Sequence, residues 1–575
     1  MDTASPFIYA YTNSASEDSD EDEVVLEKGK QIKRKKRARV SDTNVLKINF
    51  ICLQEANFVT SVKPIRCIKC PAILTSSETL LNNLDGAGRK WQCSYCGSKN
   101  TLSAERDVNQ LTEDTTYLSE QDLEEQSTKF VKTNQDIDEE DDSIIHFCID
   151  ISGSMEETII TRKEQQTTVY ISRLDATKAA ITSQLKDLAK YKPRVKVGIT
   201  TFSSEVVYNG DGHSSLEYTA KGKILENKNE LLKIGRSLNP PHEIKTSLSK
   251  LLEIVKRCKP LSLTALGPAL LICTAATSKC RGSKVILCTD GMANVGLGNL
   301  EAYSSAKNIK KAEEFYSYVS TYAKELGSSI SILAISGGEC RLAELGNVAV
   351  NTNGQVNIVD PVNLGEEFKG ILKENIVGTN VEATVILPQG FYIRDYMAID
   401  NKSMFYKTFE IGTATASTEF TLEYGLNLEK HRNLNKESIR FQLIIKFKNK
   451  KGSSIIRVIE KVMKITHDRK VAEEKINMEV LAVNALQQGG RMHGEGNIIA
   501  SKSRMRAAKR YFGKNMADDD LFSETDARIT NYLDDLHGEN ASASKAELKL
   551  KRTDIKSKNL FTNMGFSSKM FNKKK

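Results

Sequence analysis

Hydrophobic and polar residues follow three successive patterns over most of the 575-residue chain. Between 143 and about 377, short apolar runs alternate with stretches in which apolar residues recur at helical spacing. Alternating buried strands and amphipathic helices are typical of βαβ units, so this region is predicted to form a parallel sheet covered by helices. The expected strands are 143–150, 194–202, 283–290 and 328–336, and the expected helices are 175–191, 245–258 and 307–326.

The pattern changes to a period of two after this α/β region. From 378 to 467, apolar and polar residues alternate over short runs, as in the antiparallel strands of a small β-sandwich. From 468 to 540 helical spacing returns, interrupted by Gly489, Gly490 and Gly494. The chain is therefore predicted to be multidomain, with an α/β region, an antiparallel β-sandwich and C-terminal helices in succession.

Charge is concentrated at the two ends and in one internal segment, although the formal net charge is only +8. Four segments carry an excess of one sign: seven acidic residues in 17–27, eight basic residues in 28–39, fourteen acidic against three basic in 101–142, and ten basic against two acidic in 541–575. Like charges within one segment repel one another, and such segments are typically disordered. We therefore predict a disordered tail at 1–44, an acidic linker at 101–142 and a disordered basic tail at 541–575.

Composition narrows the class of protein further. Hydrophobic residues make up 39% of the chain and charged residues 27%, which is typical of soluble globular proteins. No apolar run approaches the roughly 18 residues that a membrane-spanning helix requires, and the N-terminus lacks the pattern of a secretory signal. The chain is therefore expected to be intracellular and cytoplasmic, and its eleven cysteines are expected to be reduced thiols or metal ligands.

Three common catalytic signatures are absent from the sequence, namely HExxH, GxSxG and GxxxxGK[ST]. Their absence argues against a zinc protease, a serine hydrolase and a P-loop nucleotide site. The chain is therefore predicted not to be an enzyme and to bind neither a nucleotide nor a small-molecule substrate.

Four cysteines between 45 and 100 form two CxxC pairs with 22 residues between them: Cys67, Cys70, Cys93 and Cys96. Each CxxC turn can supply two thiolates, and four thiolates satisfy the tetrahedral coordination that structural zinc prefers. The pattern predicts a closed structural Zn²⁺ site that folds this small module. A redox dithiol is the alternative interpretation. A two-zinc RING domain would need eight ligands, more than the cysteines and histidines of this window supply.

Five oxygen-bearing residues follow predicted strands or lie in a neighbouring loop: Asp150, Ser152, Ser154, Thr264 and Asp290. The carboxyl ends of parallel strands meet at one edge of an α/β sheet, which is where such sheets bind ligands. Hydroxyl and carboxylate oxygens suit a hard cation such as Mg²⁺. Strand-end caps and turn residues are the alternative interpretation, and a phosphoryl-accepting role for the first aspartate is a further one.

These five residues stand in DISGS, SLTALGPAL and VILCTDG, and together they resemble the metal-ion-dependent adhesion site of the von Willebrand factor A (vWA) domain. The resemblance covers about 143–377 and implies a Rossmann-like fold with bound Mg²⁺, or Mn²⁺ or Ca²⁺. It also implies that the two serines and the threonine offer hydroxyls, while the two aspartates act directly or through water. A carboxylate from a partner protein would then complete the coordination shell.

The two CxxC pairs, in RCIKCPAIL and WQCSYCGSKN, resemble the zinc ribbon of the COPII inner-coat proteins, with Trp91 and Asn100 as further matching residues. Those proteins run zinc ribbon, vWA-like trunk, β-sandwich and helices, and the same order is expected here over 45–540. The coat proteins end in a gelsolin-like domain, which is not expected in this chain, and their trunk generally lacks an intact metal site. The chain is also similar to vWA proteins of unicellular eukaryotes, some of which carry a permuted Ras-like GTPase; no GTPase motif occurs here.

The expected domains are a tail at 1–44, a zinc ribbon at 45–100, a linker at 101–142, a vWA domain at 143–377, a β-sandwich at 378–467, a helical region at 468–540 and a tail at 541–575. The run Lys33–Arg37 resembles a nuclear import signal, and a solvated charge run is its alternative interpretation. Contact with nucleic acid or a membrane is expected only through the basic tails.

We expect a non-enzymatic adaptor or scaffold that uses the vWA metal site to bind an acidic residue of a partner protein. A COPII-coat-like subunit of vesicle transport is the first alternative, suggested by the domain order. A nuclear vWA–zinc subunit of transcription or repair is the second. A RING-like ubiquitin ligase or a metal hydrolase is the least favoured, because zinc ligands and a nucleophile are missing.

Overall fold

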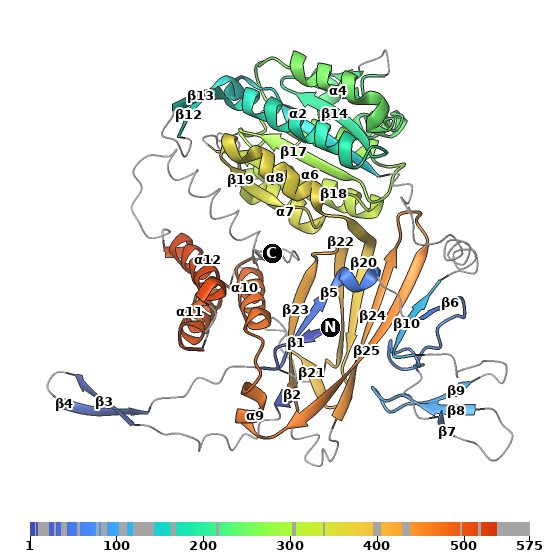
Figure 1. The fold of residues 1–575 in the computed structure, drawn as a ribbon, viewed down its shortest axis with the longest axis vertical. Helices are drawn as coiled ribbons and strands as arrows, with labels where there is room; N and C mark the ends of the chain where they lie inside the picture. The colour runs from blue at the N-terminus through green and yellow to red at the C-terminus, as the bar shows by residue number, and fades with distance from the viewer. Residues whose placement is uncertain are drawn as a thin grey trace.

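The structure of the chain is a computed structural model. It describes residues 1–5, 7–9, 22–27, 30–35, 43–54, 58–75, 80–81, 89–102, 112–118, 143–162, 168–213, 218–301, 306–336, 340–394, 404–427, 438–494, 497–515 and 519–537. Figure 1 shows the α/β region at one end of an elongated body and a β-sandwich below it, with helices and a small cysteine module on opposite sides of the sandwich.

The α/β region is built around a seven-stranded sheet in the order β16-β15-β14-β11-β17-β18-β19. Five strands are parallel: β14 (Lys196–Phe202), β11 (Ile144–Asp150), β17 (Lys284–Thr289), β18 (Ser329–Ile335) and β19 (Val356–Val359). The antiparallel β15 (Val206–Gly210) and β16 (Tyr218–Ala220) extend one edge. The strands predicted at 143–150, 194–202, 283–290 and 328–336 are confirmed within two residues at each end.

Helices cover both faces of this sheet, which is why its strands read as continuous apolar runs. One face carries α2 (Arg173–Tyr191), α4 (Ile244–Arg257) and α8 (Leu364–Lys373). The other carries α3 (Lys228–Ser237), α5 (Leu266–Ala276), α6 (Ala306–Leu326) and α7 (Leu342–Asn351). Short turns of 3-10 helix occur at Gly153–Glu156, Gly222–Glu226 and Pro361–Asn363. Among the described residues, no helix combines the length and hydrophobicity needed to cross a bilayer.

A β-hairpin that the sequence pattern did not predict separates the first strand of the sheet from helix α2. It consists of β12 (Thr158–Arg162) and β13 (Thr168–Ser172), paired antiparallel. Its base is closed by the Arg173 backbone N–H, which donates to the Glu157 carbonyl at 3.2 Å. The hairpin therefore begins close to the carboxyl end of β11, where the predicted residue Asp150 lies.

The β-sandwich takes strands from well outside the expected 378–467 segment. One sheet contains β22 (Tyr406–Thr415), β20 (Ile376–Ile386), β24 (Ser438–Lys448), β25 (Ser454–Thr466), β10 (Asp114–Tyr117) and β6 (Phe58–Thr60), and β2 (Phe7–Tyr9) pairs with β25. The other contains β1 (Asp2–Thr3), β5 (Val45–Asn49), β23 (Glu419–Leu426) and β21 (Phe391–Ile393). A 3-10 turn at Phe50–Gln54 follows β5.

These N-terminal strands differ from the prediction for 1–44, 45–100 and 101–142. Ile8 is fully buried in the core between the two sheets, and Leu46 faces Leu422 across the sheet. Each of these segments is too short and too close to charged residues to stand out as a strand, but its apolar side chains are buried in the sandwich core.

The charged segment near the N-terminus also contains a hairpin, of β3 (Asp22–Glu27) and β4 (Lys30–Lys35). Its register places acidic positions opposite basic ones, such as Glu23 with Arg34. The hairpin extends away from the rest of the chain (Figure 1).

The helical region comprises α9 (Arg469–Glu473), α10 (Met478–Gly494), α11 (Ile498–Asn515) and α12 (Asp519–His537). Gly489 and Gly490, predicted to interrupt the helical pattern, lie inside α10, whereas Gly494 is its last residue. A Cβ at Gly489 would lie 2.3 Å from the Met505 Cε, so glycine allows α11 to approach α10 closely.

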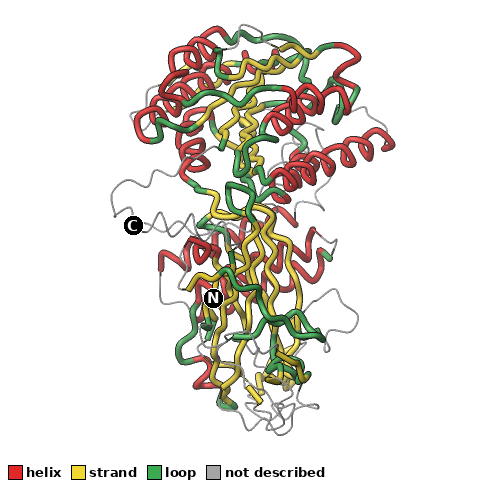
Figure 2. The backbone as a smooth tube through the Cα atoms, turned by 90° about the vertical axis from the view of Figure 1, so that its right-hand side faces the viewer, coloured by secondary structure: helices red, strands yellow, loops and turns green. Residues whose placement is uncertain are grey.

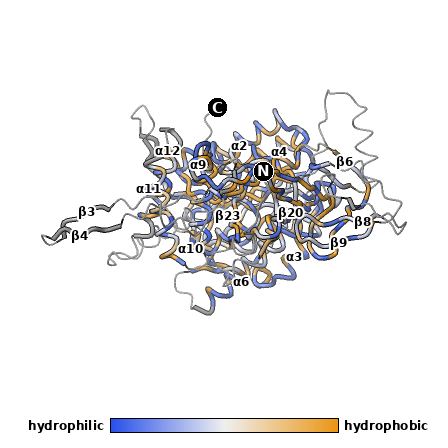
Figure 3. The backbone as a smooth tube through the Cα atoms, turned by 90° about the horizontal axis from the view of Figure 1, so that it is seen from below, coloured by the Kyte–Doolittle hydropathy of each residue, from blue (hydrophilic) through white to orange (hydrophobic). Residues whose placement is uncertain are grey.

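Each sheet of the sandwich is covered on its inner face and on part of its outer face. In the β24–β25 sheet, Leu443 and Ile445 face the core, whereas the intervening Ile444 faces the cysteine module. In the other sheet Phe420 faces the core. The adjacent Thr421 contacts α10 instead, and its backbone N–H donates to the Gln487 Oε1 at 2.9 Å. Figure 2 shows the strands of the sandwich running along the body from the α/β region, and Figure 3 shows hydrophobic and hydrophilic stretches alternating along the chain within that body.

Candidate metal centres

The predicted strand-end residues gather at the carboxyl end of the parallel sheet. Asp150 is the last residue of β11, and Asp290 directly follows the neighbouring strand β17. Both carboxylates are fully buried. The tight 3-10 turn that follows β11 brings Ser152 and Ser154 back over the strand end.

Hydrogen bonds hold the first carboxylate in place. Thr289 donates its hydroxyl to the Asp150 Oδ2 at 2.5 Å, and the Ser152 backbone N–H donates to the Oδ1 at 2.8 Å. Burial raises the pKa of Asp150 to about 7, and the nearby charge of Asp290 adds to this effect, whereas the hydrogen bonds from Thr289 and Ser152 oppose it. A buried carboxylate of this kind favours a cation nearby, because a cation stabilises its charged form.

The two serines connect the first carboxylate to the second. Their hydroxyl oxygens lie 3.1 Å apart, and the Ser154 hydroxyl donates to the Asp290 Oδ1 at 2.7 Å. Four of the five predicted residues are therefore joined in one hydrogen-bonded group.

Thr264 lies beside this group but is not hydrogen-bonded to it among the described residues. The loop that carries it is fixed by backbone bonds, from the Leu261 N–H to the Ile151 carbonyl at 2.7 Å and from the Ala265 N–H to the Ser203 carbonyl at 2.6 Å. The Thr264 N–H donates to the Asn294 Oδ1 at 2.7 Å. The loop is therefore held against the ends of β11 and β14.

Sequence reasoning missed one residue of the site, Arg173, the first residue of α2. Its side chain is only 3% exposed, and Nη1 lies 2.7 Å from the Asp290 Oδ2 and 3.3 Å from the Ser154 carbonyl. Its Nη2 pairs with the Glu157 Oε2 at 2.7 Å. A cation at a helix N-terminus is opposed by the helix dipole. An arginine two residues before the helix predicted at 175–191 was therefore the available signal that a carboxylate lies nearby.

The donors of this site match a hard divalent cation in kind. Three hydroxyls and two carboxylates offer only oxygen, which Mg²⁺, Mn²⁺ and Ca²⁺ prefer. The two serine hydroxyls lie against each other and the Ser152 N–H donates to Asp150, whereas Asp290 is shared between the Ser154 hydroxyl and a guanidinium. The site therefore already contains one positive charge of its own.

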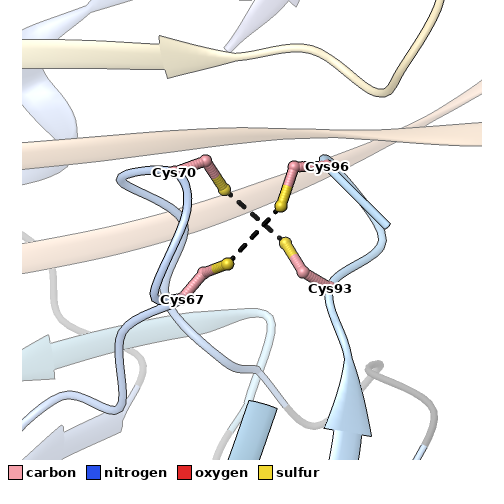
Figure 4. Close-up of side chains that lie close together, drawn as sticks. All are labelled: Cys67, Cys70, Cys93 and Cys96. Atoms are coloured by element: carbon pink, nitrogen blue, oxygen red, sulfur yellow. Dashed lines mark hydrogen bonds between the residues drawn. The ribbon is translucent and has the colours of Figure 1, made fainter. Parts of the chain in front are cut away.

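The four predicted zinc cysteines form a second centre. Their Sγ atoms lie within 4.8 Å of one another, with 3.5 Å between Cys67 and Cys96 and 3.6 Å between Cys70 and Cys93 (Figure 4). The Ser98 hydroxyl lies 2.9 Å from the Cys67 sulfur and 3.0 Å from that of Cys96. The hydrogen bond between Cys70 and Cys93 lowers the pKa of Cys93 to about 5 and raises that of Cys70. Four converging sulfurs fit a tetrahedral Zn²⁺ ion.

The cysteine module is a small three-stranded sheet with a large buried aromatic residue. Its strands are β7 (Leu80–Leu81), β8 (Arg89–Gln92) and β9 (Lys99–Leu102). Trp91 is fully buried, and the Asn100 Oδ1 accepts from the Ile68 N–H at 3.0 Å, which fixes the first cysteine turn.

The module is attached to the outer face of the sandwich by buried polar bonds. The Ile73 N–H donates to the Gln442 Oε1 at 2.9 Å, and the Gln442 Nε2 donates to the Ile73 carbonyl at 2.8 Å. The Tyr95 hydroxyl donates to the Glu460 Oε1 at 2.8 Å, and Gln442 donates to the same oxygen at 3.2 Å. Apolar contacts to Ile444 and its neighbours surround these bonds.

Residues 166–376 match the Sec23/Sec24 trunk domain family. The structure is similar to that of the human COPII-coat protein Sec24c, with a TM-score of 0.54 and 12% identity over 89% of this chain and 70% of that one. A von Willebrand factor type A protein from Catenulispora acidiphila superposes with a TM-score of 0.43 and 14% identity, over 74% of this chain and 89% of that one. The predicted fold class and the resemblance to the vWA and COPII inner-coat proteins are confirmed by the trunk match and the Sec24c fold.

The chain is also similar to a protein named Circularly permutated Ras protein 1 from Dictyostelium discoideum. The two are 28% identical over 492 residues, which is 81% of this chain and 56% of the relative. The chain therefore spans little more than half the length of that relative.

Proposed function

We propose that this chain is a non-enzymatic adaptor with a COPII inner-coat-like architecture, and that its strand-end site binds an acidic residue of a partner protein through a divalent cation. The observation that carries the proposal is the convergence of Asp150, Ser152, Ser154 and Asp290 at the carboxyl end of the trunk sheet. Mg²⁺ is the expected ion, and Mn²⁺ or Ca²⁺ would fit the same oxygen donors. The four cysteines would hold a structural Zn²⁺.

Neutral hydroxyl ligands would leave the cation able to attract another carboxylate. Ser152, Ser154 and Thr264 would supply these hydroxyls, while the two aspartates balance part of the charge. A glutamate or aspartate from a partner would then take an open position on the ion. The attraction between that carboxylate and the ion is the source of specificity in this proposal.

The loop at the rim of the site supports a protein partner rather than a small molecule. Leu261 is 49% exposed and Leu263 is 51% exposed, and both lie in the loop that carries Thr264. Leu263 also has a φ of 64°, in the left-handed region that a leucine adopts only at a cost of about 1–2 kcal/mol. Exposed apolar side chains next to a charged site are common at protein interfaces.

The test is affinity purification of the full chain and of Asp150→Ala, each with Mg²⁺ and with EDTA, followed by mass spectrometry. Partners lost both on mutation and on chelation are expected. Leu261→Ser is the matched variant for the rim, and thermal unfolding of each variant shows whether it is folded. Partners that persist in all four conditions would refute a metal-dependent contact and would place recognition elsewhere on the chain.

A coat-like role in vesicle transport is the second candidate, and the arrangement of module, trunk, sandwich and helices supports it. It predicts that liposomes carrying a GTP-loaded small GTPase recruit the chain, while GDP-loaded ones do not. A nuclear role would rest on 33–37, of which 36–37 lie outside the described residues. Deletion of 33–37 without any change in cellular location would remove that support and would favour the cytoplasm.

A further inference from the structure

We propose that Arg173 is an internal counter-cation of the strand-end site, which weakens divalent-cation binding there and connects that binding to the base of the β12–β13 hairpin through Glu157. The inference rests on the proposed function, because it concerns the same site. It goes further by assigning a role to a residue outside the predicted ligand set.

The Arg173 guanidinium lies directly against one carboxylate of the site. The two oxygens of Asp290 have different partners: Oδ1 accepts from the Ser154 hydroxyl, and Oδ2 lies 2.7 Å from the Arg173 Nη1. A cation held by the serine hydroxyls would therefore share a single carboxylate with the guanidinium. The cation and the guanidinium are both positive and the site is buried, so the presence of one makes binding of the other less favourable.

The charges of the site carry the second step. Asp150 and Asp290 are its two buried carboxylates, and Arg173 offsets one of them. A divalent ion entering the site therefore meets a formal charge of one negative unit where the two carboxylates alone would present two. Removing the positive charge of Arg173 should strengthen ion binding, whereas removing a negative charge nearby should weaken it.

Glu157 carries the third step. Its carboxylate lies 2.7 Å from the Arg173 Nη2 and is 64% exposed, at the residue from which the hairpin begins. The guanidinium is thus shared between a buried carboxylate that faces the site and an exposed carboxylate on the hairpin. Without Glu157, the guanidinium would have only Asp290 as a charged partner among the described residues, and its opposition to an entering ion would grow.

The experiment is calorimetric titration of Mn²⁺ and Mg²⁺ into the full, zinc-loaded chain. For Arg173→Gln we expect at least tenfold tighter binding than in the wild type, equivalent to about 1.4 kcal/mol. Arg173→Lys keeps the charge and should bind with an affinity close to that of the wild type. Glu157→Gln should bind two- to threefold more weakly. Asp150→Ala is the control that removes the site itself.

Each outcome separates the two proposals. Equal affinities in the wild type and Arg173→Gln would overturn the counter-cation and leave the metal-dependent adaptor standing. Binding to Arg173→Gln but not to the wild type would support the counter-cation and refute a metal-dependent adaptor in the natural chain. No binding to either would overturn both. If Arg173→Gln does not fold, Glu157→Gln decides, and unchanged or tighter binding in that variant would overturn the inference.

Discussion

Gln442 should control the attachment of the cysteine module to the sandwich. Its amide makes two hydrogen bonds to the backbone of Ile73, one in each direction, and both are buried. Gln442→Leu keeps the approximate size of the side chain and removes both partners. The Ile73 N–H and carbonyl would then be buried without hydrogen bonds at the interface, and Glu460 would lose one donor.

The magnitude follows from these groups. A buried backbone group left without a partner costs about 1–3 kcal/mol, so the two groups of Ile73 together cost roughly 4 kcal/mol. Tyr95→Phe removes one hydrogen bond to Glu460, which still accepts one from Gln442. A loss of about 1.5–2 kcal/mol in the free energy of unfolding is therefore expected. Lys446→Met, at an exposed position of the same strand, removes only an ion pair at 4.0 Å and should cost less than about 1 kcal/mol.

The chain contains its own probe for this measurement, because Trp91 is the single tryptophan and is buried in the cysteine module. Trp91 fluorescence reports the module during urea unfolding, while far-UV circular dichroism reports the whole chain. At a slope of about 2 kcal/mol/M, a loss of roughly 4 kcal/mol moves the fluorescence midpoint down by about 2 M urea. We expect that shift in Gln442→Leu, with a smaller one in Tyr95→Phe and little change in the circular dichroism midpoint.

The result that would refute this reasoning is a fluorescence midpoint in Gln442→Leu equal to that of Lys446→Met. Such a result would mean that the apolar contacts around Ile444 hold the module without the amide. A fluorescence and circular dichroism transition that moved together by the same amount would also contradict it, because the loss would then belong to the sandwich as a whole.

Two further predictions concern the four-cysteine centre and a buried aspartate. Chelation should lower the Trp91 fluorescence midpoint in the wild type by at least as much as Gln442→Leu, because removal of an ion held by four sulfurs removes the bonds that would join the two cysteine turns; an unchanged midpoint after verified metal removal would argue against a structural ion. Burial opposes ionisation of Asp211, but hydrogen bonds from His242 and His213 outweigh it and lower its pKa. The stability that it contributes is therefore complete above the pKa of the unfolded chain, near 3.8, and is lost as the pH falls through the lower folded value. Asp211→Asn should cost about 1–2 kcal/mol at neutral pH, and this difference should shrink in acid; a difference independent of pH would contradict the assignment.

The α/β region could be predicted from the sequence because its strands are buried on both faces and therefore read as unbroken apolar runs. Asp150 and Asp290 stand at the ends of two such runs, which predicts that both lie at one edge of the sheet. In the structure these two runs are neighbouring parallel strands. The two CxxC pairs were equally informative, because each pair is local in sequence and needs only one other pair to complete four ligands.

The sandwich could be predicted only in part, because its pairing is not local. Leu46 lies opposite Leu422, and Phe7 opposite Lys464, so neither partner is visible from the neighbouring sequence. The outer faces were equally hidden. Gln442 and Thr421 occupy the polar positions of an alternating pattern, which normally face water. Here they are buried and form the hydrogen bonds that attach the cysteine module on one side and α10 on the other.

Contacts between residues far apart in sequence also affect the chemistry of the strand-end site. A spacing of aspartates, serines and a threonine identifies oxygen donors, but the affinity of such a set for an ion also depends on every charge within a few ångströms. Arg173 is 117 residues from Asp290 in sequence and still lies within 2.7 Å of it, since a hairpin and a helix start bring it back to the strand ends. A complete donor set therefore predicts which ion the site would accept, whereas under the counter-cation proposal the neighbouring arginine would set the affinity. Two chains with the same five donors could accordingly differ in their need for metal, according to the residue at this helix start.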